Sequence, residues 1–191
     1  MRIGREFVLS ILEIVAFTTA LIGVILGAFG NRITWPWWIT GSLLYSYLFF
    51  QSDYFASAAL QFIFIAGGVW GWIGWGPQGA KPRRSSVRER SVLIVTLSLS
   101  SIALWPILVG VGASSTVIES FGFVGSVMAQ LLMIWQRFEA WPLWVAVNIA
   151  YTYQYFVGEL YLTSILYAIF LFVAIFGWIR WQRESKNFQI N

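Results

Sequence analysis

The chain has 191 residues, of which 59% are hydrophobic, 19% aromatic and only 10% charged, with a formal net charge of +4. Soluble domains carry charges on about a quarter of their residues, so this composition excludes an ordinary soluble protein and predicts an integral membrane protein. There is no cysteine and no histidine. Disulfides, thiolate chemistry and imidazole acid–base catalysis are therefore excluded, and we expect neither a metal site nor a cofactor.

Seven apolar stretches follow one another along the chain, and a transmembrane helix needs about 20 residues. They lie at 11–30, 36–51, 54–75, 91–112, 117–136, 141–157 and 160–180. Arg2 and Arg5 before the first stretch resemble the start of a signal peptide, but the stretch is long and leads into further spans, so we expect a retained helix. The expected fold class is an all-α integral membrane protein with seven transmembrane helices.

Three capping-box patterns mark expected helix starts, because the hydroxyl and the carboxylate of such a box each satisfy a free backbone N–H. They are Ser10-x-x-Glu13, Ser86-x-x-Glu89 and Thr116-x-x-Glu119. Pro36 and Pro142 suit the first turn of a helix. A glutamate inside a membrane can relay protons, but for Glu13 and Glu119 the capping interpretation is favoured.

The distribution of lysine and arginine predicts the orientation in the membrane. With seven spans, one side receives ten of these residues and the other side only Arg2 and Arg5. The ten are Arg32, Lys81, Arg83, Arg84, Arg88, Arg90, Arg137, Arg180, Arg183 and Lys186. The positive-inside rule then places the C-terminus in the cytoplasm and the N-terminus outside the plasma (inner) membrane. The basic stretch at 81–90 reflects this topology, and we do not expect a nucleic-acid partner.

The sequence matches itself without gaps when it is shifted by 106 residues, from Ser10–Trp75 onto Thr116–Trp181. Three spans per unit is an odd number, so the two units share one orientation only if an extra helix separates them. We therefore expect two parallel three-helix repeats joined by a linker helix (3+1+3), a transporter arrangement with the substrate near the midplane. The expected segments are a first repeat at 1–75, a basic loop and linker helix at 76–112, a second repeat at 113–182 and a cytoplasmic tail at 183–191.

The second and sixth spans are the shortest and occupy corresponding places in the repeats, which points to a binding site. Each carries a stripe at i, i+3, i+7, i+10 and i+14, one face of a helix. The stripes are Trp35, Trp38, Ser42, Tyr45 and Phe49 in the first repeat and Trp141, Trp144, Asn148, Tyr151 and Tyr155 in the second. We expect the two stripes to face each other across the repeat axis.

Two simpler interpretations compete with a binding role. Trp35 and Trp141 could be interfacial residues, since tryptophan favours the headgroup level. Asn148 lies near the middle of its helix, where an unpartnered amide is costly. An interhelical hydrogen bond and a ligand contact explain Asn148 equally well.

Amides and phenols among flat rings suit a small heteroaromatic molecule that carries hydroxyl groups. Gln61 and Gln130 add such amides on the third and fifth spans. No lysine or arginine lies inside the spans, so we expect a dephosphorylated substrate. The predicted substrate-binding residues are Trp144, Asn148, Gln61, Trp141, Tyr151, Trp38, Tyr45 and Gln130.

The chain resembles the Pnu family of vitamin transporters over essentially its whole length. The resemblance lies in the pattern E-x-W-x-x-W-x-x-x-N, here Glu139, Trp141, Trp144 and Asn148, in the sequence YSYLFFQSDYFASAALQF with its Gln61, and in the glycine-tryptophan ends of both repeats. It implies a homotrimer of seven-span protomers and facilitated diffusion of a vitamin that is later trapped by phosphorylation, most often nicotinamide riboside. Thiamine, riboflavin and deoxynucleosides remain alternatives within the family.

Other classes fit less well. A vitamin-binding membrane subunit of an ATP-driven importer would not need a direct repeat, and a SWEET-like sugar facilitator would need fewer stacked rings. An intramembrane hydrolase would need an activated nucleophile, and Ser98, Ser100 and Ser101 have no visible base. We do not expect an enzyme.

Overall fold

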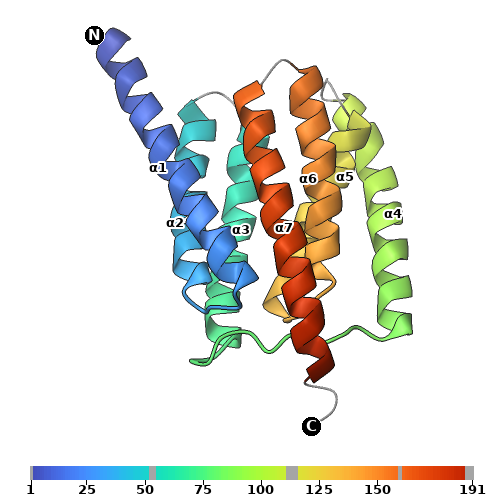
Figure 1. Cartoon of the computed structure of the whole chain (residues 1–191). Coiled ribbons are helices and arrows are strands. Elements are labelled where there is room, and N and C mark those ends of the chain that lie inside the picture. The colour runs from blue at the N-terminus through green and yellow to red at the C-terminus, as the bar shows by residue number, and fades with distance from the viewer. Residues whose placement is uncertain (1, 52–54, 111–115, 159–160, 188–191) are drawn as a thin grey trace. The chain divides into compact units, whose positions relative to one another are not determined.

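A computed structural model describes residues 2–51, 55–110, 116–158 and 161–187. These residues form two compact units, residues 1–80 and 81–191, each built from upright helices (Figure 1). Unit 1 contains α1 (Arg2–Ala28), α2 (Thr34–Gln51) and α3 (Phe55–Gly74). Unit 2 contains α4 (Val87–Gly110), α5 (Thr116–Ile134), α6 (Ala140–Val157) and α7 (Tyr161–Asn187).

Helices long and apolar enough to cross a membrane occur in both units. In the described residues, four segments qualify: Ile11–Ala28, Val87–Gly110, Val117–Ile134 and Ser164–Lys186. Leu60–Gly74 in α3 is apolar but shorter. The helices α2 and α6 are not among the four, because tryptophan, tyrosine and hydroxyl side chains replace aliphatic ones there. The protein is thus an all-helical membrane protein, and the two helices that carry the predicted stripes are not among the four segments that qualify as spans.

In unit 1, α2 packs between α1 and α3. Small residues bring α1 and α2 close together: a Cβ added to Gly41 would lie 3.3 Å from the Cα of Ala20. The Thr34 hydroxyl donates a buried hydrogen bond of 2.7 Å to the Gly23 carbonyl. Close backbone approach through small residues is the usual way in which membrane helices associate, since no hydrophobic effect separates protein from lipid there.

A buried tryptophan side chain, Trp35, makes a close contact between α2 and α3. Trp35 is fully buried and lies edge-on to Trp75, with 4.9 Å between the ring centroids. Gly71 provides the space for this ring, because a Cβ at Gly71 would overlap it. The burial of Trp35 inside the unit shows that it is not a lipid-facing interfacial residue.

In unit 2, α6 packs between α5 and α7, and α4 packs on α5. Trp141 is buried and edge-on to Trp181 at 5.7 Å, and a Cβ added to Gly177 would lie 2.6 Å from the Trp141 ring. On the other side of α6, Val147 fills the space above Gly125, where an added Cβ would lie 2.7 Å from the valine Cγ2. Trp141, like Trp35, is therefore interior to its unit and does not face lipid.

Helix α4 has no buried residue. Its exposed apolar side chains include Ile94 at 65%, Leu99 at 62% and Ile102 at 63%. Exposed apolar residues all along a helix are costly in water and favourable in lipid. The helix is therefore suited to a bilayer.

The helix ends test the capping patterns. The Ser86–Glu89 box is confirmed: Ser86 N–H donates to Glu89 Oε2 at 2.6 Å, and Glu89 N–H donates to Ser86 Oγ at 3.2 Å. The predicted start at Ser10 is wrong, because α1 already begins at Arg2 and Ser10 lies inside it. Residues 2–9 contain several good helix formers and no proline, so the helix needs no cap at Ser10. The side chain of Thr116 lies outside the described residues.

Helix bounds recur with the spacing of the sequence repeat. α2 begins at Thr34 and α6 at Ala140, and α1 ends at Ala28 and α5 at Ile134, each pair 106 residues apart. Pro36 and Pro142 both lie in the first turn of their helices, as predicted. Proline is tolerated there because the N–H that it lacks has no helical partner.

Candidate functional site

The predicted stripe on α6 divides into a packing part and a half-buried part. Trp141 is 1% exposed and Asn148 5% exposed, whereas Trp144 and Tyr151 are half-buried. The ring of Trp141 is held between Gly177 and Trp181, and its Nε1 has no hydrogen-bond partner within the described residues. Trp141 therefore supports the helix pair, and its indole N–H is the part left for a further partner.

Asn148 lies one turn from Trp144 and one turn from Tyr151 on the same face of α6. Its backbone carbonyl accepts a hydrogen bond from the Thr152 hydroxyl at 2.7 Å. Within the described residues, no hydrogen bond reaches its side-chain amide. The interhelical bond that would explain a buried asparagine structurally is thus absent from this part of the chain.

Gln130 on α5 is the other buried amide of unit 2. The residue is 2% exposed, and neither its Oε1 nor its Nε2 has a partner within the described residues. A buried amide without hydrogen bonds costs about 1–3 kcal/mol. A buried group of this kind calls for an explanation, and an unfilled ligand contact is one.

The antiparallel register of α5 and α6 gives the depth of Gln130. Glu119 lies opposite Gln154 and Gly122 opposite Tyr151. Continuing that register by helix geometry brings Gln130 level with Trp144, and Gln130 lies on the same face of α5 as Glu119 because 11 residues make about three turns. The face of α5 towards α6 thus carries polar groups from one end to near the other.

Three tyrosines form an aromatic cluster on α6 and α7. Tyr151 and Tyr155 stack at 5.9 Å between ring centroids, Tyr155 and Tyr167 at 5.2 Å, and Tyr151 and Tyr167 lie 5.0 Å apart. Gly122 leaves room for the Tyr151 ring, since a Cβ there would lie 2.5 Å from its Cζ. The Tyr151 hydroxyl also lies near the Ser126 side chain on α5. All three rings are half-buried.

Glu119 and Gln154 lie beside this tyrosine cluster. Gln154 Nε2 donates to Glu119 Oε1 at 3.3 Å, and the Gln154 Oε1 is buried without a partner in the described residues. The Glu119 carboxylate is within electrostatic range of Tyr151. Glu119 was expected only to cap its helix, and its contact with a side chain 35 residues away could not be found from a local pattern.

Unit 1 holds the remaining predicted residues. Tyr45 stacks on Phe49 at 5.7 Å, and Trp38 lies 6.1 Å from Trp35. Gln61 is half-buried on α3, at the position that Tyr167 occupies in unit 2. The predicted residues thus fall into a group of three in unit 1, namely Trp38, Tyr45 and Gln61, and a group of five in unit 2, namely Gln130, Trp141, Trp144, Asn148 and Tyr151.

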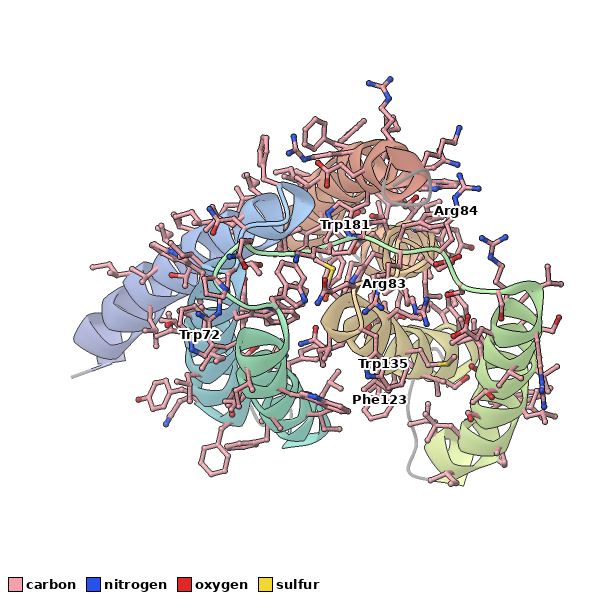
Figure 2. All side chains as sticks on the ribbon, turned by 90° about the horizontal axis from the view of Figure 1, so that it is seen from below. Trp72, Arg83, Arg84, Phe123, Trp135 and Trp181 are labelled. Atoms are coloured by element: carbon pink, nitrogen blue, oxygen red, sulfur yellow. The ribbon has the colours of Figure 1, made fainter. Side chains whose placement is uncertain are left out.

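The opposite end of unit 2 is basic and tightly connected. Arg83 and Arg84 lie on the segment before α4, and Trp135 lies at the end of α5 (Figure 2). Arg83 N–H donates to the Gln136 carbonyl at 2.8 Å, and Arg83 accepts from Phe138 N–H at 3.1 Å. This short parallel bridge fixes the basic segment to the turn between α5 and α6.

Glu139 anchors that bridge. Its carboxylate accepts from Ser85 N–H at 3.0 Å, from the Ser85 hydroxyl at 3.1 Å and from Arg90 Nε at 2.9 Å. It also pairs with Arg90 NH2 at 2.8 Å, and its side chain is only 12% exposed. Glu139 opens the E-x-W-x-x-W-x-x-x-N pattern, so the first residue of that pattern is structural. Among the described residues no group of three or more acidic side chains could hold a metal.

Comparison with known proteins identifies a family and several relatives that this chain resembles. The profile of the family described as "Nicotinamide mononucleotide transporter" matches residues 10–183. The nicotinamide riboside transporter PnuC of Escherichia coli is 25% identical, over 75% of this chain and 74% of that protein. The protein of the same name from Haemophilus influenzae is 26% identical, over 53% of this chain and 44% of that protein.

A solved structure shows the same fold. The crystal structure of the vitamin B3 transporter PnuC superposes with a TM-score of 0.79 and covers 93% of this chain and 83% of that one, at 20% identity. The match of fold and the match of the family profile both extend over nearly the whole chain. The chain belongs to the nicotinamide mononucleotide transporter family of membrane proteins.

Proposed function

We propose that this protein carries nicotinamide riboside across the plasma membrane by facilitated diffusion with alternating access. The observation that carries this proposal is the pair of buried amides, Asn148 and Gln130. Both polar atoms of the Gln130 side chain are buried without a partner within the described residues, and Asn148 lies one turn from the half-buried rings of Trp144 and Tyr151. A nicotinamide ring offers a π-face, a carboxamide and ribose hydroxyls. Relatives that share the family are named for the same riboside.

The substrate-contacting residues proposed in unit 2 are Trp144, Asn148, Tyr151 and Gln130, with Trp141 contributing its indole N–H. Those proposed in unit 1 are Trp38, Tyr45 and Gln61. Rings would stack on the nicotinamide, and amides would bond to its carboxamide and to the ribose. Gln130 lies level with Trp144, and Asn148 lies one turn further along α6, which supports one ligand contacting all three.

The family description names a mononucleotide and the curated relatives name a riboside. The helices α2, α3, α5 and α6 contain no lysine or arginine. Phosphate recognition normally uses such cations. The dephosphorylated riboside therefore fits this chain better than the mononucleotide.

We further propose that the fold is a 3+1+3 arrangement of parallel repeats, with α4 as the linker helix. The recurrence of helix bounds and of the tryptophan–glycine contacts after 106 residues supports this. The proposed segments are 1–75, 76–112, 113–182 and 183–191. The basic end of unit 2 would face the cytoplasm and the N-terminus the outside. Reporter fusions in the 76–90 loop test the orientation, and a periplasmic signal there would overturn it.

The family resemblance also implies a homotrimer. The exposed apolar length of α4 is compatible with either lipid or a second copy. Native mass spectrometry of the protein in nanodiscs should give the mass of three chains. A monomer that transports at the full rate would contradict this part of the proposal.

A ligand panel on the purified protein tests the substrate. A ligand that binds only the folded protein raises its melting temperature, by an amount that grows with ligand concentration. Nicotinamide riboside should raise it, whereas nicotinamide mononucleotide, riboflavin and deoxynucleosides should not. A shift with riboflavin alone, or with the mononucleotide as strong as with the riboside, would contradict the proposed substrate.

A further inference from the structure

The two ends of unit 2 have opposite chemical character. One end carries the arginines on the segment before α4 and in the last turns of α7, with the ion pairs of Arg90 and Arg137. At the other end α5 begins, α6 ends and α7 begins (Figure 1). That second end holds Glu119, Gln154 and the tyrosine cluster of Tyr151, Tyr155 and Tyr167.

We infer that Glu119 and the tyrosine cluster form a cation-selective subsite, which favours substrates whose heteroaromatic ring carries a positive charge over neutral rings of the same shape. The inference rests on the proposed function and names the class of substrate that the site takes. Nicotinamide riboside and thiamine carry such a ring, and riboflavin and deoxynucleosides do not.

The aromatic rings supply one part of the selectivity. Three tyrosine faces lie within 6 Å of one another, and a cation over such faces is attracted by their quadrupoles. The rings already stack on each other at distances typical of aromatic pairs. A ligand ring would therefore extend the stack on its exposed side, since all three tyrosines are half-buried and none is covered completely.

Glu119 supplies the other part of the selectivity for a positively charged ring. Its carboxylate is half-buried on α5, is held by the Gln154 amide and lies near the hydroxyl of Tyr151. A fixed negative charge in a partly desolvated place attracts a cation much more strongly than it would in water. Gln154 also offers a buried Oε1 with no partner in the described residues, which can accept a hydrogen bond from the ligand.

Unit 1 provides the contrast that makes this subsite specific to unit 2. Glu13 stands 106 residues before Glu119 and lies near Tyr45, as Glu119 lies near Tyr151. Its side chain is exposed, however, and within the described residues it has no hydrogen bond equivalent to that between Gln154 and Glu119. The positions of Tyr155 and Tyr167 are occupied there by Phe49 and Gln61. Glu13 is therefore the matched control for Glu119.

Two ligands that differ in ring charge test the inference directly. Nicotinamide riboside is a pyridinium cation, and its reduced dihydro form is neutral with nearly the same shape. The parent protein should bind the cation about tenfold or more tightly than the neutral form by titration calorimetry, and Glu119→Gln should reduce this ratio to about one to three because it weakens the binding of the cation more than that of the neutral form. Glu13→Gln should keep the parent ratio.

The possible outcomes distinguish a failure of the proposed function from a failure of the inferred cation-selective subsite. If the parent protein binds neither ligand, the proposed function itself is wrong. If it binds the riboside and Glu119→Gln keeps the parent ratio, or weakens both ligands equally, the charge-selective subsite is wrong and the function stands. Should Glu119→Gln fail to fold, Tyr155→Phe and Tyr155→Leu replace it: the phenylalanine should keep the ratio and the leucine should lower it, and equal ratios in both would overturn the inference.

Discussion

Helices α1–α3 and helices α5–α7 share the same tryptophan–glycine contacts and differ in the polar residues of the predicted stripes. In both, a buried tryptophan of the middle helix fits over a glycine of the third helix and meets a second tryptophan edge-on, as in Trp35 with Trp75 and Trp141 with Trp181. The contacts that differ lie on the stripes. Ser42 in the first triplet corresponds to Asn148 in the second, and both are buried.

The two triplets therefore keep the same packing contacts between helices and differ in the polar residues on their stripes. The tryptophan–glycine contact allows the middle helix to pack closely on the third, so it recurs with little change. Among the described residues, the buried amides and the hydrogen-bonded acid lie in the second triplet, where Glu119 is bonded to Gln154 and Gln130 is buried. We therefore expect that substitutions in the shared contact affect stability in both triplets, whereas substitutions on the stripes affect binding mainly in the second.

The largest effect is expected from filling the glycine contacts. Gly71→Ala and Gly177→Ala would each place a Cβ against a tryptophan ring that is buried and cannot move aside. Overpacking of this kind costs about 1–3 kcal/mol, so both variants should melt several degrees below the parent. Gly74→Ala is the control, because an added Cβ there meets nothing within 4 Å. Equal melting temperatures for all three variants would contradict the shared scaffold.

Substitutions at corresponding stripe positions should affect ligand affinity differently in the two triplets. Asn148→Ala should weaken the affinity for nicotinamide riboside by about 1–3 kcal/mol, because the ligand loses its buried amide partner. Ser42→Ala, at the corresponding position, should change it by less than a factor of three. Titration calorimetry on both variants gives the comparison, and an equal loss in the two would show that the triplets contribute alike.

Gln130→Met should have opposite effects on stability and on binding. The amide of Gln130 is buried without a partner in the described residues, so an apolar side chain of similar length should stabilise the ligand-free protein by up to about 1–3 kcal/mol. The same variant should lose affinity for the riboside. If its melting temperature falls and its affinity stays, Gln130 is a structural residue and not a ligand contact.

The smallest effects are expected at the charged end of unit 2. Glu139→Gln should destabilise the protein by about 1–2 kcal/mol, since the carboxylate is largely buried and accepts from Ser85 and Arg90. Glu184→Gln breaks the more exposed pair with Arg180 and should cost about 0.3–0.5 kcal/mol. The two melting temperatures test this order, and a larger loss for Glu184→Gln would reverse it.

Local patterns predicted much of the fold. Apolar stretches of membrane-spanning length predicted seven helices, and the Ser86–Glu89 box marked the start of α4. The same kind of pattern failed at Ser10, because a hydroxyl and a carboxylate three residues apart also occur inside a helix. Whether a cap is used depends on the residues before it, and residues 2–9 favour continuing the helix.

The sequence supports the candidate site residues best where they form a stripe on one helix. Asn148 and Tyr151 stand out by their spacing on α6. The roles of Glu119 and Glu139 depend on partners 35 residues and about 50 residues away. No spacing rule links such pairs, because their contact is created by the packing of α5 on α6 and by the bridge between Arg83 and Arg137.

Uptake by proteoliposomes tests the central claim most directly. Vesicles that contain the purified protein and unlabelled nicotinamide riboside should take up labelled riboside by exchange, at a rate that proton and sodium ionophores do not change, and an excess of nicotinamide mononucleotide should not compete. Uptake that requires an ion gradient, or transport of the mononucleotide at the rate of the riboside, would contradict a gradient-independent carrier of the dephosphorylated vitamin.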